Sequence, residues 1–126
     1  MKNREDVIEW LKRAKSNLEK AKLGRDSKWI LYEDLCFDAQ QCAEKSLKAL
    51  LISLDITFPW THSIDTLLQL VSKTGIDIPE KIKESVILTR YAVETRYPGE
   101  PSSVDIEKYK KAVELAEKVY KWVTEI

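Results

Sequence analysis

Apolar residues recur along most of the chain at alternating spacings of three and four residues, the period of an amphipathic α-helix. In residues 4–23 they form one stripe, which consists of Val7, Leu11, Ala14, Leu18 and Ala21. Residues 28–54 carry a wider apolar surface, which consists of Leu31, Tyr32, Leu35, Cys36, Phe37, Ala39, Ala43, Leu47, Leu50 and Leu51. Such a surface contacts neighbours on several sides, so we expect the second helix to be the centre of the fold.

Three further helices are predicted toward the C-terminus. The first of them is short, can be capped by Thr61 or Ser63, and has the apolar residues Ile64, Leu67, Leu68 and Val71. The next spans residues 79–96, with the inward positions Ile82, Val86, Thr89 and Val93. The last begins near residue 103 and carries two adjoining stripes, one made of Ile106, Tyr109, Val113, Ala116, Tyr120 and Val123, the other of Ala112, Leu115, Val119, Trp122 and Ile126. So wide an apolar face predicts either a deep position in a bundle or a contact between subunits.

Glycine and proline separate these helices. All three glycines and all four prolines fall where a predicted helix begins or ends, and no segment has the pattern of a β-strand. Short connections between long amphipathic helices favour antiparallel neighbours. We therefore predict an all-α fold, an up-and-down antiparallel bundle of four to five helices, in which residues 1–126 form a single domain.

Charge and motif content exclude several classes of function. The 21 lysines and arginines balance the 21 aspartates and glutamates, so net charge gives no long-range attraction to nucleic acid. The chain has no Walker-type phosphate loop, dinucleotide fingerprint, serine elbow or zinc-protease motif. Its single histidine excludes a metal site built from several histidines of one chain. We expect neither a cofactor nor a bound metal.

The pattern of charges and cysteines favours the cytoplasm. The N-terminal residues are too highly charged for a signal peptide, and the longest apolar run, residues 49–52, is far too short to cross a membrane. Cys36 and Cys42 lie about 120° apart on a helix, which fits neither a redox pair nor a zinc half-site. We interpret both as small packing residues and predict a cytoplasmic protein without membrane contact.

Charge, aromatic rings and a helix end converge in residues 89–99. On a helix, Arg90, Glu94 and Tyr97 share one face, while Arg96 points about 120° away from Arg90. In a structural interpretation, Arg90 pairs with Glu94, and Arg96 caps the terminal carbonyl groups. In a functional interpretation, the two guanidinium groups beside tyrosine rings form a site for phosphate or a nucleobase.

Other polar residues lie on or near the second helix. His62 precedes the third helix, where it either hydrogen-bonds in a loop–helix junction or takes part in catalysis. Glu44 and Lys48 form a favourable helical pair in the preferred order. We expect Gln40, Gln41 and Glu44 to be solvated or packed at a subunit seam.

Three blocks of the chain, in this order, resemble the signature blocks of HEPN domains (higher eukaryotes and prokaryotes nucleotide-binding). The first block is residues 41–51, with the sequence QCAEKSLKALL. The second is residues 61–64, THSI, followed by Leu67 and Leu68. The third is residues 96–99, RYPG. Together they are fairly specific, and the resemblance covers nearly the whole chain.

The resemblance implies a bundle of four to five helices, commonly dimeric. It also implies a small prokaryotic protein that is often encoded beside a minimal nucleotidyltransferase, as a two-component or toxin–antitoxin pair. Many HEPN proteins are metal-independent ribonucleases, whose site is an arginine followed, after four to six residues, by a histidine. Two subunits bring two such motifs together.

Arg90 matches the arginine of this motif, but Arg96 occupies the position of the histidine. Arginine is not deprotonated at working pH, so Arg96 cannot act as the base for a ribose 2′-hydroxyl group, although it could hold phosphate. This departure favours a non-catalytic module that binds a separately encoded minimal nucleotidyltransferase, a nucleotide or both, as a homodimer or higher homo-oligomer. Its candidate contact residues are Arg90, Glu94, Arg96, Tyr97 and His62.

Two alternatives remain open at this point. One is a ribonuclease toxin that cleaves RNA with Arg90 and Arg96 in a composite dimer site, to which the partner contributes His62. The other is an oligomerisation module without a ligand.

Overall fold

The computed structural model describes residues 4–24, 27–93 and 104–126, and the regular elements in these residues are all helical. In chain order they are α1 (Glu5–Lys22), α2 (Tyr32–Ser53), α3 (Ile64–Ser72), α4 (Glu80–Lys83), the 3₁₀-helix η1 (Glu84–Thr89), α5 (Arg90–Val93) and α6 (Ile106–Glu125). The prediction of an all-α fold is confirmed.

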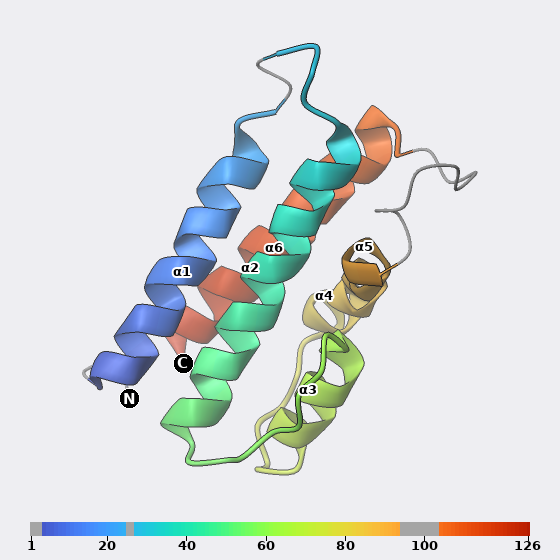
Figure 1. The fold of residues 1–126 in the computed structure, drawn as a ribbon. Helices are drawn as coiled ribbons and strands as arrows, with labels where there is room; N and C mark the ends of the chain where they lie inside the picture. Colours follow the sequence, from blue (N-terminus) through green and yellow to red (C-terminus); the bar gives the residue numbers. More distant parts are fainter. Residues whose placement is uncertain (1–3, 25–26, 94–103) are drawn as a thin grey trace.

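The central helix of the bundle is α2. It packs against α1, α3, η1, α5 and α6, and its inward side chains are fully buried, among them Ala39, Ala43, Leu47 and Leu50. In Figure 1, α1, α2 and α6 lie side by side, and the N- and C-termini are at the same end of the bundle. Consequently α1 and α2 are antiparallel, as predicted for neighbouring helices, whereas α6 packs against α2 and runs in the same direction as α2.

The two cysteines belong to this core. Cys36 and Cys42 are free thiols with no exposed surface, and Cys42 lies near the backbone of α6, with its Sγ atom 3.9 Å from the carbonyl oxygen of Ala116. Burial raises the pKa of each thiol to about 12, so both stay protonated at neutral pH. The interpretation as packing residues agrees with this environment.

Capping residues fix several helix ends. Ser63, rather than Thr61, caps α3, because its side chain accepts a hydrogen bond from the backbone N–H of Thr66. Gly24 and Gly75, at φ values of 70° and 92°, follow α1 and α3 in a backbone conformation that favours glycine.

The predicted start of the second helix was wrong. The helix begins at Tyr32 instead of residue 28, since Leu31 has the extended backbone of a helix cap and is 49% exposed. Residues 28–31 therefore belong to the connection between α1 and α2.

The segment predicted as one helix over residues 79–96 contains a 3₁₀ stretch in its middle. The buried positions of the whole segment are Ile82, Ser85, Leu88 and Tyr91. These positions are three residues apart, the period of a 3₁₀-helix, whereas the prediction used the α-helical period. Val86 and Thr89, which were predicted to face inward, are only partly buried: Val86 packs against the core, and the Thr89 hydroxyl group accepts a hydrogen bond from the backbone N–H of Ile64. The side chain of Val93 lies outside the described part of the chain.

The position of the last helix, α6, in the bundle explains most of its wide apolar face. It contacts α1, α2, α4 and η1 and buries Ala112, Leu115, Ala116, Val119 and Val123. Ile106 and Ile126, at its two ends, remain 45% and 43% exposed. Within the described residues, no helix combines the length and the apolar character that crossing a membrane requires.

Candidate functional site

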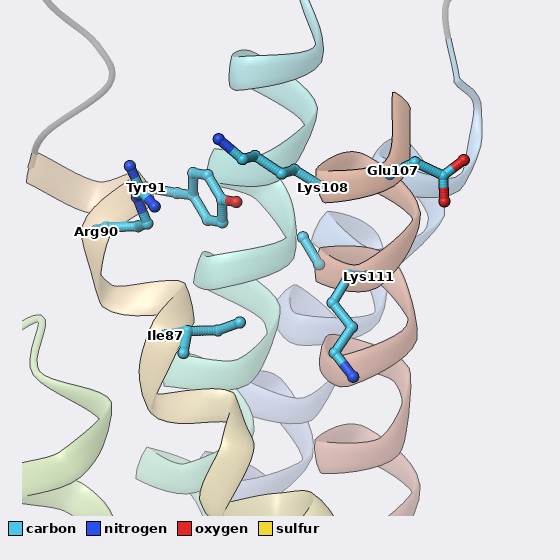
Figure 2. Close-up of a pocket in the computed structure, with 7 residues that line it drawn as sticks. Ile87, Arg90, Tyr91, Glu107, Lys108 and Lys111 are labelled. Carbon is cyan, nitrogen blue, oxygen red and sulfur yellow. The ribbon is translucent and has the colours of Figure 1, made fainter. Parts of the chain in front are cut away.

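A pocket of about 360 Å³ lies between α6 and the segment formed by η1 and α5. It is lined by Ile87, Arg90, Tyr91, Glu107, Lys108, Lys111 and Ala112. Figure 2 shows Ile87, Arg90 and Tyr91 on one side of the pocket and Lys108 extending toward the Tyr91 ring from α6. We refer to it as the Arg90 pocket.

Positive charge dominates the Arg90 pocket. Arg90, Lys108 and Lys111 line it, and among the described lining residues Glu107 carries the only carboxylate, which points away from η1 and α5 in Figure 2. Lys111 is partly neutralised by Glu84, since its Nζ atom lies 3.3 Å from the Glu84 carboxylate. The cationic side chains that line the pocket suit an anionic ligand.

The wall of the Arg90 pocket is aromatic and aliphatic. The guanidinium carbon of Arg90 lies 5.8 Å from the centroid of the Tyr91 ring, within cation–π range. Tyr91 is only 4% exposed, and burial raises the pKa of its phenol, so the ring stays neutral. Together with Ile87 and Ala112, this ring offers an apolar surface beside the cationic groups.

A second group of polar residues is buried within the bundle, between α2 and the loop before α3. One carboxylate oxygen of Glu44 lies 2.9 Å from Gln40 Nε2 and 2.9 Å from His62 Nδ1, and the other lies 2.7 Å from Lys48 Nζ. Gln40, Glu44 and Lys48 are at most 5% exposed. We call these three residues and His62 the Glu44 network.

The predicted environment of Gln40 and Glu44 was wrong. We expected solvated residues or a subunit seam, but the two side chains are enclosed by their own chain. The enclosure is tolerated because every group of the buried pair finds a partner: Lys48 neutralises Glu44, and the Gln40 amide and His62 ring occupy the second carboxylate oxygen. Gln41 is half-buried and donates a hydrogen bond to the side-chain oxygen of Gln40.

His62 lies at the edge of the Glu44 network, with 43% of its side chain exposed. An ionised carboxylate only accepts hydrogen bonds, so Nδ1 of His62 is the donor to Glu44, and a neutral ring then carries its lone pair on Nε2. The ring of Trp60 stands edge-on to His62 at a centroid distance of 6.0 Å. The hydrogen bond to Glu44 and the contact with Trp60 thus hold the imidazole ring in one orientation.

One hydrogen bond links the first residue of α3, two residues after His62, to the last residue of η1. The backbone N–H of Ile64 donates to Thr89 Oγ1 at 3.1 Å, and Arg90 directly follows Thr89. His62 itself is not among the described residues that line the Arg90 pocket. The structure therefore places the two groups on neighbouring segments without merging them into one site.

The comparison with protein families decides the class of the molecule. The HEPN domain model matches residues 7–126. The chain belongs to the HEPN family. This confirms the resemblance that the three sequence blocks indicated.

Two solved structures resemble this HEPN chain over nearly their whole length. An archaeal HEPN homologue, ST0689, is 28% identical, with a TM-score of 0.72 and coverage of 94% of this chain and 95% of that one. The protein TT1696 from Thermus thermophilus is 30% identical, with a TM-score of 0.76 and coverage of 97% and 98%. No curated protein sequence matches the chain.

The candidate contact residues that the sequence suggested are only partly within the described structure. Arg90 lines its pocket and His62 belongs to the Glu44 network, while Glu94, Arg96 and Tyr97 lie outside the described residues. Sequence reasoning missed Lys108 and Lys111, because only the apolar stripes of the last helix were considered. Their spacing of three residues on the polar side of that helix is the signal that could have found them.

We expect Glu44 to make stability depend on pH in the acid range. Burial works to raise the pKa of Glu44, but the hydrogen bonds from Lys48, Gln40 and His62 outweigh it and hold the pKa below the ordinary value of 4.5. A carboxyl group whose pKa is lower in the folded state stabilises the fold above its unfolded pKa, and this stabilisation is lost as pH falls through the folded pKa. Urea unfolding of the natural protein and of Glu44→Gln, at several pH values, measures the effect.

The difference in free energy of unfolding between these two proteins should be constant above about pH 5 and should shrink at lower pH. Taking the difference removes the contributions of other carboxylates that also have lowered pKa values, such as Glu84 and Glu117. If the difference in free energy of unfolding does not change between about pH 6 and about pH 3, the pKa of Glu44 is not lowered in the folded protein.

Proposed function

We propose that this HEPN protein is a non-catalytic module that binds a nucleotide, a separately encoded minimal nucleotidyltransferase, or both, and that it acts in the cytoplasm as a homodimer. The observation that carries the proposal is the Arg90 pocket, where cationic side chains meet an aromatic and aliphatic wall. A nucleotide presents the complementary chemistry, with anionic phosphates joined to a planar, largely apolar base.

The size and the donors of the Arg90 pocket support a ligand of this kind. Its volume of about 360 Å³ falls in the range of about 300–1,000 Å³ that is usual for small-molecule sites. The Arg90 guanidinium group offers paired N–H donors that match two phosphate oxygens, and Lys108 adds a point charge from the opposite side. Ile87 and Tyr91 would contact the base.

The same residues support binding rather than catalysis. Arginine and lysine stay protonated at neutral pH, and the neutral Tyr91 phenol does not accept a proton from a ribose hydroxyl group. Among the described lining residues this leaves Glu107, whose carboxylate points away. A pocket of this composition neutralises phosphate charge without a base placed to remove a proton.

A specific observation favours a metal-independent ribonuclease as the second candidate. The buried Glu44 carboxylate orients the half-exposed His62 ring, the arrangement that prepares an imidazole for proton transfer. Cleavage of RNA in EDTA that is abolished by both Arg90→Ala and His62→Ala would establish this candidate. Absence of cleavage at high protein concentration would exclude it.

Replacing Arg90 with glutamine should weaken nucleotide binding about tenfold or more, the loss expected when one charge-assisted contact to phosphate is removed. Calorimetric titration with ATP measures the dissociation constant. Lys108→Gln should weaken binding in the same direction, whereas Lys118→Gln, on the same helix but outside the pocket, should leave it unchanged.

Two further results separate the parts of the proposal. Co-purification with a nucleotidyltransferase encoded next to this protein would establish the partner, and its loss in Arg90→Gln would place the contact at the pocket. If ATP does not bind and no such nucleotidyltransferase co-purifies, the proposed function is wrong.

A further inference from the structure

A second pocket, of about 370 Å³, lies on the outer face of α1 and α2. Its lining residues are Glu9, Trp10, Arg13 and Lys45. It shares no residue with the Arg90 pocket, whose lining comes from η1, α5 and α6. We call it the Trp10 pocket.

Lys45 is a cation of the Trp10 pocket that is held in place by a hydrogen bond rather than by a direct ion pair. Its Nζ atom donates to the amide oxygen of Asn17 at 2.8 Å, and Asn17, which is only 7% exposed, is held in turn by Asp38 at 2.9 Å. In the described part of the chain Lys45 forms no ion pair. Burial, together with the like charges of Lys20 and Arg13, lowers the pKa of Lys45 despite the opposing effect of Glu44 and Asp38.

A second cation stands at the same pocket. Arg13 pairs with Glu9 one helical turn away, with an N–O distance of 3.1 Å, but both side chains are at least half exposed to solvent. An exposed pair of this kind contributes little and exchanges readily with water. The Arg13 guanidinium group can therefore turn to another anion at little energetic cost.

Trp10 supplies a flat surface whose position is set from inside the bundle. The ammonium group of Lys48 lies 5.9 Å from the centroid of the Trp10 ring, and Glu44 holds that ammonium group at 2.7 Å. Lys48 also lies 5.7 Å from the ring of Phe58. The buried ion pair thus fixes Trp10, which is itself only partly exposed at the pocket.

We propose that the Trp10 pocket binds a nucleotide, whose base stacks on the Trp10 ring and whose phosphate contacts Lys45 and Arg13. A planar ring face and two cations next to it recognise a planar base and the charge attached to it. A bound phosphate also gives Lys45 a direct anionic contact, since its Nζ atom donates to the neutral Asn17 amide, while in the described residues the carboxylates of Glu44 and Asp38 act on it without a direct ion pair. The shared chemistry is a base with a phosphate, carried either by a free mononucleotide or by a nucleotide of a single-stranded RNA.

The indole N–H signals of the four tryptophans in an NMR spectrum test this site separately from the Arg90 pocket, which has no tryptophan among its described lining residues. The Trp10 signal is assigned from its loss in Trp10→Phe. Addition of AMP should shift this signal and leave that of Trp29, in the loop between α1 and α2, in place. The same shift should occur in the Arg90→Gln protein. Loss of binding at the Arg90 pocket and absence of binding at the Trp10 pocket are therefore distinguished.

Lys45→Gln should raise the dissociation constant for AMP, read from the Trp10 signal, about tenfold or more. Arg13→Gln should raise it less, and Lys12→Gln, an exposed neighbour outside the pocket, should not change it. Adenosine should bind much more weakly than AMP. A short single-stranded RNA that shifts the Trp10 signal at lower concentration than AMP identifies the strand as the source of the nucleotide, and equal or weaker binding identifies the free mononucleotide.

The proposal is overturned if millimolar AMP and the RNA both leave the Trp10 signal in place, or if adenosine and AMP bind equally. If urea unfolding shows that Lys45→Gln does not fold, the dissociation constant of Arg13→Gln for AMP tests the proposal instead. An unchanged dissociation constant in that variant then counts against the site.

Discussion

Replacement of Glu44 by glutamine should lower the free energy of unfolding by about 3–5 kcal/mol, the cost of leaving one member of a buried ion pair without its partner. Glu44 and Lys48 each expose only 6% of their side chains, so water cannot replace the lost carboxylate. The glutamine amide also presents a donor toward Gln40 or His62, both of which donate to Glu44 in the natural protein. Urea unfolding followed by circular dichroism measures the change.

Two variants separate the buried charge from the loss of the individual hydrogen bonds. Glu44→Gln combined with Lys48→Met removes both charges and should recover a large part of the lost stability, because methionine fills similar space among Trp10, Phe58 and Trp60. His62→Gln, at a half-exposed position, should cost less than about 1 kcal/mol. If the double variant is no more stable than Glu44→Gln, the unpaired lysine is not the cause.

Leu50→Ala should destabilise the fold by about 2–5 kcal/mol, through lost apolar burial and the cavity that remains. Leu50 lies in the last part of α2, has no exposed surface and belongs to the core that α2 shares with its neighbours. The surrounding helices cannot collapse fully into the vacated space, because α2 packs against several of them at once. Urea unfolding again gives the free energy of unfolding.

Leu23→Ala is the matched control, since the chemical change is identical and Leu23 is 61% exposed at the end of α1. It should alter the free energy of unfolding by no more than about 0.5 kcal/mol. Similar losses in the two variants would mean that the core is not centred on α2.

The parts of the fold that follow from apolar periodicity could be predicted from the sequence. The stripes of the first, second and last helices lie in the core largely as their spacing indicates, because helices of this length bury whichever face is apolar. The start of the second helix was misplaced, since the apolar residue Leu31 extended the pattern into a loop, where this side chain is exposed.

The 3₁₀ stretch could not be predicted with the same rule. Its buried positions at intervals of three include Ser85, whose hydroxyl group donates to the backbone carbonyl of Ile82 and so tolerates burial. A serine among apolar positions hides the period from any count of hydrophobic residues. Tertiary contacts with α2, α3 and α6 decide the local helix type.

The candidate sites were predictable only in part, for a related reason. Arg90 was found because charge and aromatic rings converge at its helix end, and His62 because it belongs to a recognisable sequence block. Lys108 and Lys45, in contrast, join their pockets through the packing of helices distant in sequence. The burial of Glu44 was missed, because a glutamate–lysine pair spaced four residues apart is usually a surface feature. Its enclosure depends on the loop residues 58–62, which cover it.

The pitch of η1 determines where Arg90 points. Over six residues, a 3₁₀-helix is about 3 Å longer than an α-helix and winds about 120° further. Arg90 is the first residue after this stretch, so the same sequence wound as an α-helix would turn its side chain by about a third of a revolution relative to Lys108. Any substitution that converts η1 to the α-helical pitch would therefore dismantle the Arg90 pocket while leaving the chemical identity of its cationic residues untouched.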